Sequence, residues 1–273
     1  TPAYAGTEFE GLLPPSISHE GYSAKPMHSY WDDFFAYRGY RDAVAMARVL
    51  GQDIVATRWQ AAADSFGRAI TTTVARTMAR HGIAYVPGAA DLGDFDATST
   101  TVALTPTGAE ALLPRTALEA TFQRYYDTAS ARRNPATAWE AYTPYELRTV
   151  GSLLRLGRRE QALAMLDQFL DDQEPPAWRQ WPEVVWKDRR APKFIGDLPH
   201  TWVGSDFLRA AADLFAWERE ADSALVLGMG LRDAWTQDGG TTVRGLRTWW
   251  GPVSYTARRE GNVVSFTLAA GTR

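Results

Sequence analysis

The stretch His28-Ser29-Tyr30-Trp31-Asp32-Asp33-Phe34-Phe35 decides the fold class, because it begins the first of several amphipathic helices. From Trp31 to Leu50, apolar residues recur at steps of three or four, which is the period of an α-helix. Gly51 follows at once, and glycine commonly ends a helix. The spacing therefore predicts a helix over residues 31–50.

The same stretch places two adjacent carboxylates, Asp32 and Asp33, among four aromatic rings in the first helical turn. Acidic groups are favoured at a helix N-terminus, so capping alone is one interpretation. Capping needs one oxygen, whereas carbohydrate sites combine rings that stack on sugar faces with acids that bind hydroxyls or transfer protons. Both interpretations stay open for this segment.

Helical periodicity continues along most of the chain and then changes. Further helices are predicted over residues 54–82, from Thr116 onward, and over 143–157, 158–170 and 205–220. After residue 222 the pattern becomes short, alternating and β-branched. The sequence thus predicts a mainly α protein in three parts: an irregular segment 1–30, a helical-hairpin domain 31–221 and a C-terminal antiparallel β unit 222–273.

The composition excludes several function classes and favours none by itself. The net charge is −3 with scattered basic residues, so we expect neither a nucleic-acid partner nor a membrane partner. No apolar run approaches the roughly 20 residues that span a bilayer. Cysteine is absent and the four histidines lack metal-ligand spacing, so no metal site is expected. The compartment stays undecided.

Three loops combine carboxylates with aromatic residues: 28–33, 91–100 and 178–202. In an array of antiparallel hairpins alternate loops lie at one end, so we expect the three to converge. The long loop at 172–204 is rich in tryptophan, and loops of that length in compact domains are usually functional or disordered.

Within these loops, the candidate general acid is Asp32 or Asp33, and Glu183 is the candidate base. Asp94, Asp96 and Asp197 are reserve bases, although the segment around Asp96 also fits an ordinary helix N-cap. Nine residues are expected to bind sugar rings and hydroxyls: His28, Tyr30, Trp31, Arg38, Trp178, Trp181, Asp197, His200 and Trp202.

Four segments resemble the six-hairpin glycosidases, the trehalase-like and glucoamylase-like enzymes. They are Tyr30–Phe35 with the helix up to Gly51, the run Gly151-Ser152-Leu153-Leu154-Arg155-Leu156-Gly157, the block 178–207, and Trp249-Trp250-Gly251-Pro252-Val253-Ser254-Tyr255. The resemblance implies an (α/α) barrel and hydrolysis of a glycosidic bond with inversion by two carboxylates. It implies an oligosaccharide or polysaccharide substrate and no cofactor.

One departure concerns the number of helices. A six-hairpin barrel has twelve helices, and the periodicity predicts about six here. Three explanations stay open: an N-terminal half lies outside this chain, a partner or self-association completes the barrel, or the hairpins form an open array.

Two other functions compete with the hydrolase. A non-catalytic carbohydrate-binding or interaction module on the same helices would keep the aromatic residues and need no acid–base pair. The pair Asp32-Asp33 also resembles the magnesium-binding aspartates of class I terpene cyclases, but Ala36 and Tyr37 stand where a further acid is needed.

Overall fold

The computed structural model describes residues 4–19, 21–190 and 192–269. These residues form two compact units, Thr1–Asp127 and Thr128–Arg273, and each is described by itself. The described residues contain seven α-helices and a small antiparallel C-terminal sheet. The mainly helical class is therefore confirmed, and the described residues show no barrel.

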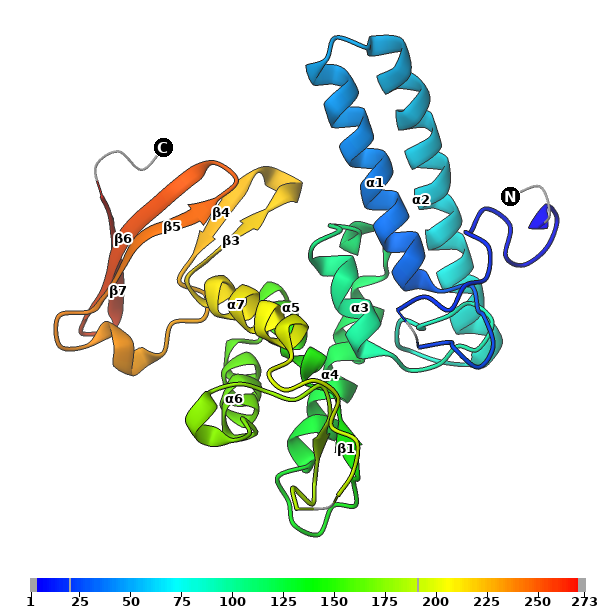
Figure 1. The fold of residues 1–273 in the computed structure, drawn as a ribbon. Helices are drawn as coiled ribbons and strands as arrows, with labels where there is room; N and C mark the ends of the chain where they lie inside the picture. Colours follow the sequence, from blue (N-terminus) through cyan, green and yellow to red (C-terminus); the bar gives the residue numbers. More distant parts are fainter. Residues whose placement is uncertain (1–3, 20, 191, 270–273) are drawn as a thin grey trace. The chain divides into compact units, whose positions relative to one another are not determined.

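The first unit is built on a long helical hairpin (Figure 1). Helix α1 (Tyr30–Val49) packs against α2 (Asp53–His81), and both bury apolar residues such as Phe34 and Ile70 along the shared face. Helix α2 ends at Gly82 in the left-handed conformation, with φ of 61°. The expected helices over 31–50 and 54–82 are thus confirmed.

Two shorter helices follow α2: α3 lies within this unit, and α4 leads into the next. Helix α3 (Ala97–Leu104) packs on α1, and the 3₁₀ turn η2 (Glu110–Leu112) contacts α2. Helix α4 (Arg115–Ala131) spans the boundary between the units and confirms the helix expected after Thr116. The irregular residues 4–19 and 21–29 lie at the end of the hairpin where α1 begins (Figure 1).

The second unit contains another helical hairpin and a third helix packed on it. Helix α5 (Arg148–Arg155), preceded by the 3₁₀ turn η3 (Pro144–Leu147), pairs with α6 (Arg159–Asp171). Helix α7 (Thr201–Phe215) packs on α5. The 3₁₀ turn η4 (Pro176–Trp178) and a two-residue ladder of β1 (Ala141–Tyr142) with β2 (Val185–Trp186) lie in the intervening loops.

The β region begins earlier than the sequence predicts. Helix α7 ends at Phe215, and Ala216–Arg219 forms β3, which pairs with β4 (Ala224–Leu227). The expected helix over 205–220 is wrong at both ends, because pairing with β4 decides the conformation of residues 216–219.

The three remaining strands form one antiparallel sheet in chain order. These strands are β5 (Thr241–Thr248), β6 (Gly251–Glu260) and β7 (Val263–Leu268). Of the two 3₁₀ turns in this region, η5 (Glu220–Asp222) lies between β3 and β4, and η6 (Asp233–Thr236) lies between β4 and β5. A local core of Ala216, Leu231, Val253, Tyr255 and Ala257 lies beneath them. The expected antiparallel C-terminal unit is confirmed.

Candidate functional site

Two of the three expected loops meet in the first unit. The backbone N–H of His28 donates to Oδ2 of Asp91 at 2.6 Å, and its ring nitrogen Nδ1 lies 3.1 Å from the same atom. The carbonyl of His28 accepts from the N–H of Ala90 at 2.9 Å. Loops 28–33 and 91–100 therefore converge as expected. Loop 178–202 belongs to the second unit, so its convergence with them stays a prediction.

Asp32 is half-buried at the start of α1 and faces the irregular segment before it. Its Oδ1 accepts a hydrogen bond from the Ser18 hydroxyl at 3.0 Å, and its Oδ2 accepts one from Ser16. Ser18 also contacts the hydroxyl of Ser29 at 2.9 Å. The carboxylate of Asp32 thus lies in a cluster of three serine hydroxyls and remains within reach of solvent.

Asp33 has the opposite environment. Its side chain is 1% exposed; Oδ1 accepts from the N–H of Leu13 at 3.0 Å, and Oδ2 has no hydrogen-bond partner among the described residues. Burial raises the pKa of Asp33 to about 8; the Leu13 hydrogen bond opposes the rise, and the charge of Asp32 adds to it. Asp33 therefore keeps its proton at neutral pH, behind Asp32 and out of contact with solvent.

The two reserve bases in this unit, Asp94 and Asp96, accept hydrogen bonds that stabilise the local fold. Asp96 caps α3 by accepting from the N–H of Ser99 at 2.9 Å, which confirms the N-cap interpretation. Burial raises the pKa of Asp96, but hydrogen bonds from His19 and Ser99 outweigh burial and hold it below its usual value. Asp94 accepts from the Tyr22 hydroxyl at 3.0 Å and from the N–H of Ala89 at 3.0 Å.

The expected sugar-binding residues of this unit divide by exposure. Tyr30 is 1% exposed and its hydroxyl contacts Thr77, while the buried ring of His28 stacks on Phe9 at 4.1 Å. Both rings lie inside the protein, so the expectation that they touch a sugar directly is corrected by their burial. Trp31 is partly exposed, and its ring packs against that of His19 in a T-shaped arrangement with centroids 4.7 Å apart.

Arg38 lies one helical turn away from Asp42 on α1. It pairs with that carboxylate at 2.8 Å and also reaches the carbonyl of Pro106. Its guanidinium is therefore engaged within the chain.

In the second unit the long loop folds back on itself. The N–H of Glu183 donates to the carbonyl of Asp197 at 3.2 Å, and that of Val184 to Ile195 at 3.0 Å. Gly196 has φ of +68°, and a Cβ there would lie 2.1 Å from Oε2 of Glu183. The side chain of Glu183 thus covers the Gly196 backbone, and only glycine fits beneath it.

The tryptophans of this loop are not equivalent. Trp181 is 1% exposed, and its indole N–H donates to the carbonyl of Phe169 at 2.7 Å. It is a core residue, and its burial corrects the expectation that it stacks on a sugar. Trp178 and Trp202 are 59% and 47% exposed, so both keep a ring face available.

A polar cluster surrounds His200 just before α7. Its Nε2 lies 2.5 Å from the Tyr145 hydroxyl, and its Nδ1 lies 3.5 Å from Oδ2 of Asp197. The ring of Trp202 contacts that of Tyr145 with centroids 4.9 Å apart. This cluster combines hydroxyl, imidazole and carboxylate groups beside an exposed indole, which is the chemistry that binds sugar hydroxyls.

Asp206 on α7 extends this cluster. Arg148 donates to its Oδ2 at 2.9 Å and places its guanidinium 5.5 Å from the ring of Trp202. Burial raises the pKa of Asp206, and the charges of Arg148 and His200 oppose that rise. The sequence did not single out Asp206, because its contact with Arg148 joins α5 to α7 across 58 residues of chain.

The pattern Thr143-Pro144-Tyr145-Glu146 predicts a capping box, in which the side chains of Thr143 and Glu146 bond the backbone of the first helical turn, but this box does not form. Thr143 makes no side-chain cap, and Glu146 accepts two hydrogen bonds from the Arg132 guanidinium, at 2.7 and 2.9 Å. Arg132, which follows the end of α4, therefore binds the carboxylate that the local pattern assigned to the backbone.

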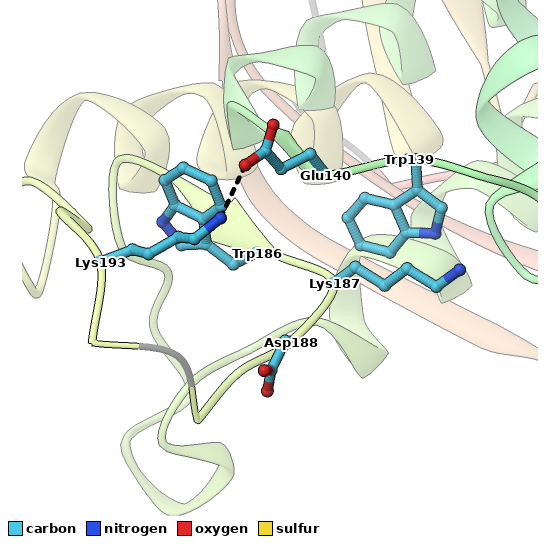
Figure 2. A pocket seen from close by; sticks show the side chains of 6 residues that line it. All are labelled: Trp139, Glu140, Trp186, Lys187, Asp188 and Lys193. Atoms are coloured by element: carbon cyan, nitrogen blue, oxygen red, sulfur yellow. Dashed lines mark hydrogen bonds and ion pairs between the residues drawn. The ribbon is translucent and has the colours of Figure 1, made fainter.

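A pocket of about 340 Å³ in this unit was not predicted (Figure 2). It is lined by Trp139, Glu140, Trp186, Lys187, Asp188 and Lys193. Its residues come from two segments that are brought together by the β1–β2 ladder. Only the abundance of tryptophan and charged side chains in both segments could have indicated it.

Among the described residues, no group of three histidine, aspartate or glutamate side chains is placed to hold a metal ion. Within the same residues, no helix has both the length and the apolar character needed to cross a membrane.

Comparison with known proteins assigns no relationship: no protein-family model matches this chain, and no curated protein matches it in sequence.

Proposed function

We propose that this chain is a glycoside hydrolase, or the C-terminal portion of one, that cleaves a glycosidic bond with inversion. The observation that supports this best is the pair of carboxyl groups at the start of α1. Asp32 meets solvent beside Trp31, while Asp33 is buried and stays protonated at neutral pH. Neighbouring acids in such different environments are typical of sites that divide chemical roles.

In this proposal Asp32 is the general acid, because Asp33 is too deeply buried to touch a substrate. A sugar bound over Asp32 would exclude water from around its carboxyl group. Trp31 supplies an adjacent ring for the apolar face of the sugar. Asp33 remains neutral behind the site, so it adds no second negative charge beside the acid.

Glu183 is the proposed base, activating a water on the opposite face of the sugar. Its carboxylate is partly exposed and fixed by the folded-back loop over Gly196. Trp202, His200 and Asp197 of the same unit supply a ring and polar groups for sugar hydroxyls. In inverting glycosidases the acid and base carboxyl groups lie roughly 6.5–9.5 Å apart, and the proposal requires this separation for Asp32 and Glu183.

The test is hydrolysis of a panel of aryl glycosides and oligosaccharides by the wild type, D32N and E183Q. Each substitution preserves side-chain shape and should lower turnover by a factor on the order of 10²–10⁴. The matched controls are D42N in the first unit and D222N in the second, which alter exposed ion-paired carboxylates and should retain activity. Proton NMR of the first product should show an inverted anomer.

A second function, non-catalytic carbohydrate binding, is favoured by one observation. Both oxygens of Asp32 accept hydrogen bonds from serines of the same chain, a structural role that needs no catalysis. If the wild type hydrolyses nothing in the panel yet binds oligosaccharides, and D32N and E183Q bind equally well, the hydrolase proposal is wrong and this function replaces it.

A further inference from the structure

We propose that the pocket between Trp139 and Trp186 is a binding site for one ring of a neutral oligosaccharide, separate from the residues assigned to catalysis. The ligand class rests on the proposed function, while the site itself rests on the geometry of the second unit. None of the six residues that line the pocket belongs to the expected acid, base or sugar-binding set.

The β1–β2 ladder brings the two tryptophans together. Ala141 pairs with Trp186, and the N–H of Lys187 donates to the carbonyl of Glu140 at 2.9 Å, which continues the ladder by one residue. Side chains alternate between the faces of such a ribbon, so Trp139 and Trp186 lie on the same face. Figure 2 shows the two indoles on opposite sides of the pocket with Asp188 below them.

Both indole N–H groups are already used inside the chain. Trp139 donates to the carbonyl of Arg132 at 3.2 Å, and Trp186 donates to that of Phe194 at 2.8 Å. These bonds fix the two rings in orientation, and the Trp139 ring also contacts that of Tyr142, with centroids 6.1 Å apart. A flat apolar face that is fixed in place is what the C–H face of a pyranose ring packs against.

The charged groups of the pocket balance one another. Lys193 pairs with Glu140 at 2.6 Å and places its ammonium 4.4 Å from the centroid of Trp186, so it covers one face of that ring. This contact makes Trp139 the platform for a ligand and Trp186 the opposite wall. With two lysines and two acids in the lining, the pocket carries no net charge, which favours a neutral ligand.

The polar groups around the tryptophans suit hydroxyls. Glu140 and Asp188 are exposed carboxylates that can accept from sugar hydroxyls. The Lys187 ammonium is held by the carbonyls of Pro135 and Thr137, at 3.3 and 2.7 Å, which keeps it beside the pocket (Figure 2). A volume of about 340 Å³ is at the lower end of the roughly 300–1,000 Å³ typical of small-molecule sites. This size suits a single ring rather than a buried chain.

The test measures binding without relying on hydrolysis. Hexaoses of glucose, xylose and mannose are titrated into the full chain by isothermal calorimetry, using the wild type, W139A, W139F and W249A. Trp249 is an exposed indole in the turn between β5 and β6 of the same unit and serves as the matched control. W139F keeps an aromatic face, so it separates loss of the platform from loss of folding.

We expect at least one hexaose to bind the wild type, W139A to weaken that binding by a factor on the order of ten or more, and W139F and W249A to keep most of it. The site proposal is overturned if the wild type binds none of the hexaoses, or if W139A binds as the wild type does. Tighter binding of an anionic hexuronate oligomer that weakens with salt would also overturn it, because a neutral ligand would then be the wrong class.

Hydrolysis of a short aryl glycoside, measured on the same variants, separates this proposal from the proposed function. If W139A loses hexaose binding while no variant hydrolyses any glycoside, the pocket proposal is supported and the hydrolase proposal is wrong. If D32N abolishes hydrolysis while W139A binds as the wild type does, the hydrolase stands and the pocket proposal fails.

Discussion

Asp32 and Asp33 show how far one position along a helix changes the chemistry of a side chain. Successive helical residues point about 100° apart, so one carboxylate turns toward the serine cluster and the other toward the interior. Asp33 then meets only one hydrogen-bond donor, the N–H of Leu13, and burial governs its pKa. Burial therefore disfavours the charged form of Asp33 in the folded chain.

The first prediction concerns the dependence of stability on pH. Asp33 has a pKa of about 8 in the folded chain and an ordinary value of 3.8, so the folded state binds more protons between these limits. The free energy of unfolding should therefore fall as pH rises from about 4 to 8, by about 1.4 kcal/mol for each unit of pKa difference.

Urea unfolding at pH 5 and pH 8.5 measures this effect. The wild type should lose a few kcal/mol more between these values than D33N, which carries no charge at either pH. D42N, altered at an exposed carboxylate, should behave as the wild type does. An equal pH dependence in D33N and the wild type would show that Asp33 is ionised in the folded protein.

At the scale of elements, α5 and α7 are joined by a buried ion pair. Arg155 donates to both oxygens of Asp213, at 2.6 and 3.2 Å, and the two side chains are only 6% and 4% exposed. The helices approach closely at Gly151, where a Cβ would lie 2.5 Å from Oδ2 of Asp213. Glycine at this position therefore makes room for the carboxylate.

The second prediction is that breaking this pair costs more than removing it. R155M leaves the buried carboxylate of Asp213 without its main partner and should destabilise the protein by about 3–5 kcal/mol. The double variant R155M/D213L replaces both charges with apolar groups and should recover much of that loss. Chemical denaturation of the two variants measures the difference. A double variant less stable than R155M would contradict this account.

At the scale of the whole molecule, one end of the α1–α2 hairpin exposes four large apolar side chains. Met46, Val49, Leu50 and Ile54 lie on either side of the turn that joins the helices, and each is more than half exposed. Contiguous apolar patches of this kind tend to recruit partners. An array of hairpins that is completed by another copy would cover such a surface.

The third prediction is that the chain self-associates through this end of the hairpin. Sedimentation velocity should show an average mass that rises with concentration for the wild type and stays monomeric for the double variant V49K/I54K. V263K, which changes an exposed valine on β7, is the matched control and should associate as the wild type does. A wild type that is monomeric at every concentration would contradict the prediction.

Periodicity predicted the elements whose residues interact within a few positions of one another. The long helices α1 and α2 lie close to their expected positions, and the strands β5 to β7 lie within the expected β unit. In these segments the apolar residues keep the helical spacing of three to four residues or the strand spacing of two without interruption. The N-cap at Asp96 was also visible, since Asp96 and Ser99 are three residues apart. Strand β3 was missed, because its partner β4 decides its conformation.

The candidate sites depended on contacts that no local pattern contains. Tyr30 and Trp181 have the same aromatic chemistry as Trp31 and Trp202, yet the first two are in the core and the last two reach solvent. The Trp139–Trp186 pocket joins residues almost fifty positions apart, and the bond from Arg132 to Glu146 replaced an expected capping box. Packing decides which member of a chemically similar set is accessible.

The sequence by itself determined the mainly helical class, the long hairpin and the antiparallel C-terminal strands, because local hydrogen bonding and side-chain periodicity specify these elements. Only the tertiary structure decided that Asp33 is buried and protonated, that Asp32 faces solvent, and that two tryptophans line one pocket. Burial and charge pairing depend on which distant segments come into contact, and those contacts set the dielectric surroundings and partners of each side chain.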